Sequence, residues 1–69
     1  MLRLTFEREK RGLTKAKLAA LSDMHASFIG QLESGRLKPF KPWIEKLENV
    51  FNMPGEKLFE EVDDNGNSI

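Results

Sequence analysis

Apolar residues recur every three or four positions along most of the chain, which is the spacing of amphipathic helices. This spacing predicts helices over residues 2–11, 15–22, 26–34 and 41–51, and a short fifth helix that begins after Pro54. No stretch alternates between apolar and polar residues as a half-buried strand does. The sequence therefore predicts an all-α fold, a compact domain of five helices.

Residues at the predicted helix ends support these boundaries. Thr14 can accept a hydrogen bond from a free backbone N–H in the first turn of the second helix. Gly35 and Asn52 follow the third and fourth helices, where a left-handed cap conformation costs them little. The apolar side chains expected to face the core are Leu4, Leu18, Leu21, Ile29, Leu32, Trp43, Ile44, Leu47, Val50 and Phe51.

The third predicted helix has an unusual outward side. Ser27, Gln31 and Ser34 project away from its apolar side and carry no charge, although 32% of the chain is charged. A solvated helix face usually carries Lys and Glu, whereas short hydrogen-bonding side chains suit close approach to another surface. Only about three residues join this helix to the preceding one, and that spacing matches a helix-turn-helix unit.

Charge is distributed unevenly although the formal net charge is zero. Residues 1–41 hold nine of the eleven Lys and Arg residues and four acids, a net of +5. Residues 42–69 hold two Lys residues and seven acids, a net of −5. This split predicts one basic and one acidic face, and a basic face suits the phosphates of a nucleic acid.

Several classes of site are excluded or disfavoured by composition. The chain has no cysteine and one histidine, so we expect no disulfide, metal or cofactor. His25 has no Ser, Cys or paired carboxylate at a recognisable spacing, and we therefore expect no enzymatic activity. No apolar run approaches the roughly 18–20 residues of a membrane span, and a cytoplasmic location fits.

A set of motifs falls in register without insertion over about residues 3–60. It consists of Gly12-Leu13-Thr14, Leu18-Ala19, Leu21-Ser22, Ile29, Leu32-Glu33-Ser34-Gly35, Pro39, Leu47 and Leu58-Phe59. With these motifs the chain resembles the Xre-type helix-turn-helix family, the DNA-binding domain of lambdoid phage repressors and many bacterial regulators. The chain departs from the family pattern at Phe6-Glu7, Lys15, Asp23, Phe40 and Glu48.

The resemblance implies a lambda repressor-like fold whose third helix lies in the major groove of double-stranded DNA. The base contacts it implies are at His25, Ala26, Ser27 and Gln31. The phosphate contacts it implies are at Lys15, Ser34, Arg36, Lys38 and Lys41. It also implies a structural ion pair between Arg8 and Glu33.

The same resemblance implies a sequence-specific transcriptional regulator that binds a palindromic operator. We expect repression by blocking polymerase, although activation is equally compatible with the residues. We also expect a homodimer, because a compact monomer has too little surface for tight specific binding. Its dimer contacts are expected at Phe51, Met53, Leu58 and Phe59. Residues 1–60 are expected to form this domain and residues 61–69 a disordered acidic tail. An alternative is an antitoxin-like protein-interaction module of a toxin–antitoxin pair, whose acidic C-terminal half binds the protein partner.

Overall fold

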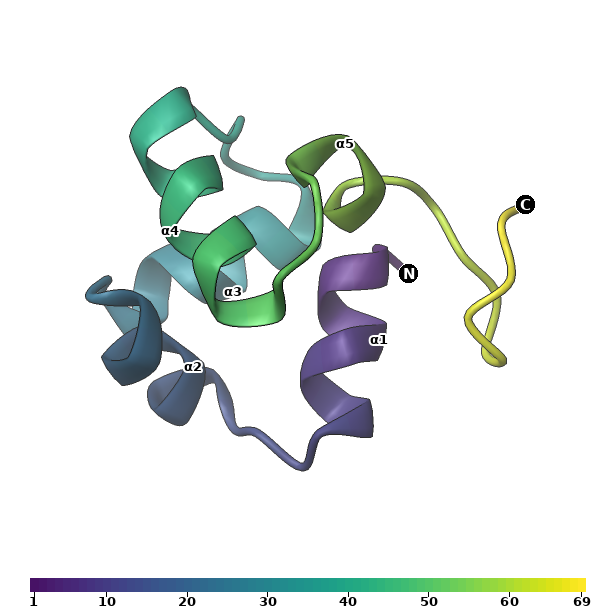
Figure 1. Cartoon of the computed structure of the whole chain (residues 1–69), viewed down its shortest axis with the longest axis horizontal. Helices are drawn as coiled ribbons and strands as arrows, with labels where there is room; N and C mark the ends of the chain where they lie inside the picture. Colours follow the sequence, from purple (N-terminus) through teal and green to yellow (C-terminus); the bar gives the residue numbers. More distant parts are fainter.

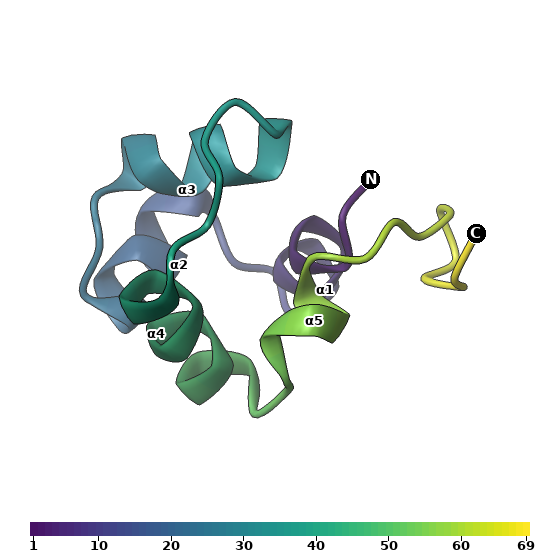
Figure 2. The same ribbon diagram turned by 90° about the horizontal axis from the view of Figure 1, so that it is seen from above.

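The computed structural model describes all 69 residues, and they form five helices without a β-sheet (Figure 1). The helices are α1 (Arg3–Lys10), α2 (Lys15–Ser22), α3 (Ala26–Ser34), α4 (Lys41–Phe51) and α5 (Gly55–Leu58). α2 packs against α3 and α4, and α5 packs against α4 and α1. In both views α1, α5 and the C-terminal segment lie on one side of the molecule, opposite α2 and α4 (Figures 1 and 2). The predicted all-α, five-helix fold is confirmed.

The helices begin and end where their sequence signals predict. The Thr14 hydroxyl accepts a hydrogen bond of 3.0 Å from the backbone N–H of Lys17 at the start of α2. Gly35 and Asn52 both take the left-handed conformation, with φ of 79° and 53°, and they end α3 and α4. These caps satisfy backbone groups that the last helical turn leaves without a partner.

The turn between α2 and α3 depends on Asp23. Asp23 has the left-handed conformation (φ 56°, ψ 50°), which costs an L-residue about 1 kcal/mol. Lys46 on α4 donates a hydrogen bond of 3.0 Å to the Asp23 carbonyl, and its ammonium lies 3.6 Å from the Asp23 carboxylate. Lys46 of α4 therefore contacts both the backbone and the side chain of the turn residue, although the Asp23 side chain is 99% exposed.

One apolar core joins all five helices. Its buried members are Leu4, Leu18, Ala19, Ile29, Leu32, Leu47, Phe51 and Leu58. The expectation that Leu21 faces this core is wrong, because the side chain is 54% exposed. The inward side of α2 instead runs from Leu18 to Ser22, one turn later, and the Ser22 hydroxyl donates to the Leu18 carbonyl at 2.8 Å.

The C-terminal segment is folded against the N-terminus, which differs from the disordered tail that the sequence predicts for residues 61–69. Leu2 and Glu61 form an antiparallel bridge, and the backbone N–H of Val62 donates to the Met1 carbonyl at 2.8 Å. Val62 is fully buried. A lone apolar residue among polar ones gives little sequence signal, and its partners lie some sixty residues away.

Two further contacts hold this segment. Arg3 binds the Glu60 carboxylate at 2.7 and 2.9 Å, and this hydrogen bonding lowers the pKa of Glu60. The Phe6 ring lies where a side chain on Gly66 would stand, and Gly66 has φ of 82°. Glycine suits this position, because a larger residue would be strained at this φ and its Cβ atom would displace the Phe6 ring.

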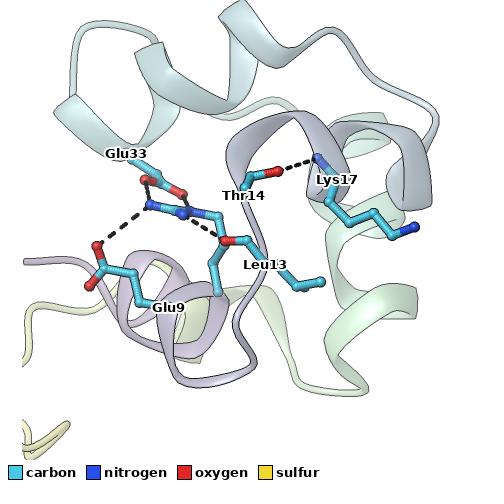
Figure 3. A network of polar contacts seen from close by, with 6 residues as sticks. Glu9, Leu13, Thr14, Lys17 and Glu33 are labelled. Atoms are coloured by element: carbon cyan, nitrogen blue, oxygen red, sulfur yellow. Dashed lines mark hydrogen bonds and ion pairs between the residues drawn. The ribbon is translucent and has the colours of Figure 1, made fainter.

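The predicted ion pair between Arg8 and Glu33 ties α1 to the end of α3 (Figure 3). Arg8 donates to the two Glu33 carboxylate oxygens at 2.7 and 3.1 Å and to the Leu13 carbonyl at 2.9 Å. The two side chains are only 10% and 7% exposed. The hydrogen bond to Glu33 is the main cause of the raised pKa of Arg8. Such a pair fixes geometry, because either charge would be costly to bury alone.

Removing two methyl groups from the buried C-terminal segment tests whether this segment belongs to the folded unit. We expect Val62→Ala to lower the free energy of unfolding by about 2 kcal/mol, because it leaves a cavity where apolar atoms were buried. Ile69→Ala is the matched control, since that side chain is 86% exposed. Urea denaturation followed by circular dichroism measures both. Equal stability of the two variants would show that the segment is not part of the core.

Neutralising Glu33 tests the ion pair that holds α3. We expect Glu33→Gln to lower the free energy of unfolding by about 3 kcal/mol, because Arg8 keeps a buried charge without its counter-charge. Glu9→Gln is the control, since Glu9 also lies near Arg8, at 3.7 Å, but is 57% exposed. The double variant Arg8→Met/Glu33→Leu should recover most of the loss. If Glu33→Gln and Glu9→Gln were equally stable, the pair would have no structural role.

Candidate nucleic-acid interface

α2, the turn at Asp23 and α3 form a helix-turn-helix unit. Figure 2 shows α3 along the outer edge of the molecule, with α2 beneath it. Ile29 and Leu32 turn inward from α3 and are at most 1% exposed. With these two residues in the core, the opposite side of α3 must face solvent, and the Arg8–Glu33 pair limits rotation of the helix about its axis.

The outward side of α3 carries three of the four predicted base contacts. Ala26 and Ser27 are exposed and lie in the first turn, while Gln31 is half-buried one turn later. The Ser34 hydroxyl donates to the Gln31 carbonyl at 3.2 Å, within the helix. No hydrogen bond within the protein engages the side chains of Ser27 or Gln31, so their polar groups are available to a ligand.

His25, the fourth predicted base contact, lies at the N-cap position of α3. Its backbone is extended (φ −78°, ψ 141°), as an N-cap requires, but its side chain makes no capping hydrogen bond. The exposed ring instead contacts Phe28 edge-on, with 5.7 Å between the ring centroids. His25 therefore stands at the end of α3 that would enter a groove first.

Aromatic rings connect α3 to the start of α4, a contact that the sequence did not predict. Phe28 stacks on Trp43 with a centroid distance of 4.8 Å and an interplanar angle of 27°. Phe40, which is 46% exposed, also contacts Trp43, with 4.0 Å between the ring centroids and an interplanar angle of 58°. Nothing in the sequence identifies Trp43, fifteen positions after Phe28, as the partner of Phe28.

Lys15 lies closer to α3 than its sequence position suggests. Its Nζ is 3.9 Å from the point that a Cβ on Gly30 would occupy, and its Cδ is 4.0 Å from the same point. The side chain therefore crosses from the first residue of α2 to the middle of α3. Lys15 is exposed and takes part in no ion pair.

The cations divide into two groups by their partners. Four cations lie within 4 Å of a carboxylate: Arg3, Arg8, Arg11 and Lys46. The other seven have no such partner, and all of them are exposed. Five of the seven are in the first turn of α2 or in the segment that follows α3: Lys15, Lys17, Arg36, Lys38 and Lys41. The remaining two are Lys10 on α1 and Lys57 on α5. Most of the unpaired positive charge thus flanks the uncharged outward side of α3.

The four residues predicted to form dimer contacts do not form one exposed surface patch. Phe51 and Leu58 are 3% and 0% exposed and belong to the core of the single chain, so the expectation of dimer contacts there is corrected. Met53 and Phe59 are partly buried and pack against the same core. The sequence did not distinguish these roles, because a core residue and an interface residue have the same apolar character.

The surface has shallow hollows, and none lies on the outward side of α3. The largest one is between α2 and α4 and is lined by Leu21, Lys46 and Val50 among others. Another of the hollows is lined by His25 together with Ala19, Ala20, Asp23 and Met24, beside the start of α3. The chain has no group of three or more side chains suited to hold a metal ion. No helix is both long and apolar enough to cross a membrane.

Comparisons with known proteins agree with this geometry. The family described as "Helix-turn-helix domain" matches residues 2–60, which include all five helices. Searches of curated proteins and of solved structures give no significant match. The match covers most of the chain, and so this chain belongs to the helix-turn-helix domain family.

Proposed function

We propose that this chain is a transcriptional regulator that binds a specific sequence of double-stranded DNA through α3. The observation that carries the proposal is the unpaired positive charge on both sides of an uncharged helix face. A protein that binds DNA needs cations for the phosphates and short polar side chains for the base edges. Four of the other six cations are held in internal ion pairs, whereas none of the five at the start of α2 and after α3 has a carboxylate partner.

The first turns of α3 would read the bases. Gln31 has one amide donor group and one carbonyl acceptor, a combination that can pair with N6 and N7 of adenine in the major groove. Ser27 can donate or accept, and Ala26 can contact a thymine methyl group. His25 is the N-cap residue of α3, and its side chain would lie near a neighbouring base. The aromatic stack of Phe28 on Trp43 keeps this end of α3 fixed relative to α4.

The loop after α3 would hold the phosphates. Arg36, Lys38 and Lys41 are exposed and unpaired, and they lie along one segment that follows the reading helix. Ser34, at the end of α3, adds a hydroxyl near the same segment. Contacts of this kind fix the orientation of a protein on the duplex without reading the sequence.

A homodimer on a palindromic operator follows from the size of the domain. Its extents are 29 × 24 × 23 Å, whereas one turn of duplex DNA is about 34 Å long. A single copy can therefore place one α3 in one segment of the major groove, and two copies are needed for two half-sites. Repression would result when such a dimer covers a promoter. The stoichiometry on duplexes with one and with two half-sites tests this part of the proposal.

Selection of bound sequences from random duplex DNA tests the proposal as a whole. We expect the chain to enrich one short palindromic sequence at low salt. Gln31→Ala should remove the preference at one base pair of each half-site, by about 1–3 kcal/mol. Lys38→Ala is the matched contrast, because it should weaken binding to all sequences alike and reduce the slope of log K against log salt by about one.

Two outcomes would contradict this account. If the unchanged protein enriched no duplex at low salt, DNA would not be its ligand. If Lys38→Ala removed a base preference while Gln31→Ala weakened all sequences equally, the roles assigned to α3 and to its following loop would be reversed. Circular dichroism of each variant checks that the fold is retained, and both side chains lie outside the core.

A further inference from the structure

The side chain of Lys15 occupies a different place from the one its position in the sequence predicts. At the first residue of α2, Lys15 was expected to reach a phosphate at the rim of the groove. In the structure its Cδ and Nζ lie 4.0 and 3.9 Å from the point where a Cβ on Gly30 would stand. The outer half of the side chain therefore runs along α3, toward the surface that would enter the groove.

Gly30 belongs to the outward side of α3. Successive residues of a helix are separated by about 100° around its axis, so Gly30 is about 60° from Ser27 and about 40° from Ser34. Ile29, in the core, is about 100° away in the opposite direction. The polar side chains on the outward side of α3 are uncharged. The Lys15 ammonium beside Gly30 thus places a positive charge next to them.

No side chain at position 30 separates Lys15 from α3. Glycine is one of the least favourable residues in a helix interior, and Gly30 has an ordinary helical conformation that does not require it. An Ala methyl group at this position would be in ordinary van der Waals contact with the Lys15 side chain. The Lys15 side chain therefore lies beside α3 at Gly30.

We propose that Lys15 reads a guanine in the major groove, where its ammonium donates to the O6 and N7 acceptors, and that it is not primarily a phosphate contact. Guanine is the base that presents two acceptors on its major-groove edge. Lys15 is exposed and has no carboxylate partner, so its three N–H donors are available. This inference rests on the proposed DNA-binding function and adds one specificity-determining residue outside α3.

The test compares sequence selection from random duplex DNA by the unchanged protein, Lys15→Met and Lys38→Met. Methionine keeps most of the aliphatic stem of lysine and removes the charge. We expect the unchanged protein to select a guanine in each half-site, at a base pair other than the one that Gln31→Ala affects. Lys15→Met should lower discrimination at that base pair by about tenfold or more and keep the other preferences. Lys38→Met should keep every preference and bind all duplexes more weakly.

The proposal on Lys15 is overturned if Lys15→Met selects the same sequence as the unchanged protein and behaves like Lys38→Met, with uniform weakening and a smaller salt dependence. That result would show that Lys15 contacts a phosphate and does not read a base, and the proposed DNA-binding function would still stand. If the unchanged protein selects no duplex, the DNA-binding function and the role of Lys15 both fail. Thermal unfolding monitored by Trp43 fluorescence confirms that each variant is folded.

Discussion

The orientation of α3 about its own axis is the constraint on which the rest of the structure depends. Ile29 and Leu32 bind one side of the helix to the core, and Glu33 is held by Arg8 of α1. The Phe28–Trp43 stack adds a contact with α4 at the other end. A rotation by one residue, about 100°, would bury polar side chains and expose apolar ones. The polar outward side is therefore a consequence of how the helix is anchored.

Ion pairs determine which cations remain unpaired in this chain, whose formal net charge is zero. Arg3, Arg8, Arg11 and Lys46 are each matched with a carboxylate, and three of these pairs join segments that are distant in sequence. The cations at the start of α2 and after α3 have no such partner. A net charge of zero is thus compatible with a locally basic surface, because seven of the acids lie in residues 42–69, after these cations in the sequence.

The sequence predicted the helices and their caps, which depend on the local spacing of apolar residues and on the residues at the helix ends. All five helices and the left-handed caps at Gly35 and Asn52 were found where expected. The Arg8–Glu33 pair, which the family resemblance implied, was also found. Contacts between distant residues were not predicted, as the burial of Val62 beside the N-terminus shows.

In the candidate interface, helical spacing predicted the uncharged face of α3, and the resemblance supplied the cations expected to bind phosphates, all of which are exposed. The position of Lys15 over Gly30 was not predictable, because no rule of spacing brings the start of one helix to the middle of the next. The core roles of Phe51 and Leu58 were also missed, since composition alone does not distinguish the inside of one chain from the contact between two.

The most direct test of the central claim is a titration of the protein with its selected duplex, followed by two-dimensional ¹H–¹⁵N NMR. The claim is that the outward side of α3 and its flanking cations form the DNA interface. It predicts that the largest amide shift changes occur at the start of α2, along residues 25–34 and in the loop 36–41, while α5 and residues 60–69 stay unchanged. Changes concentrated in α5 and the acidic C-terminal segment, with none in α3, would contradict it.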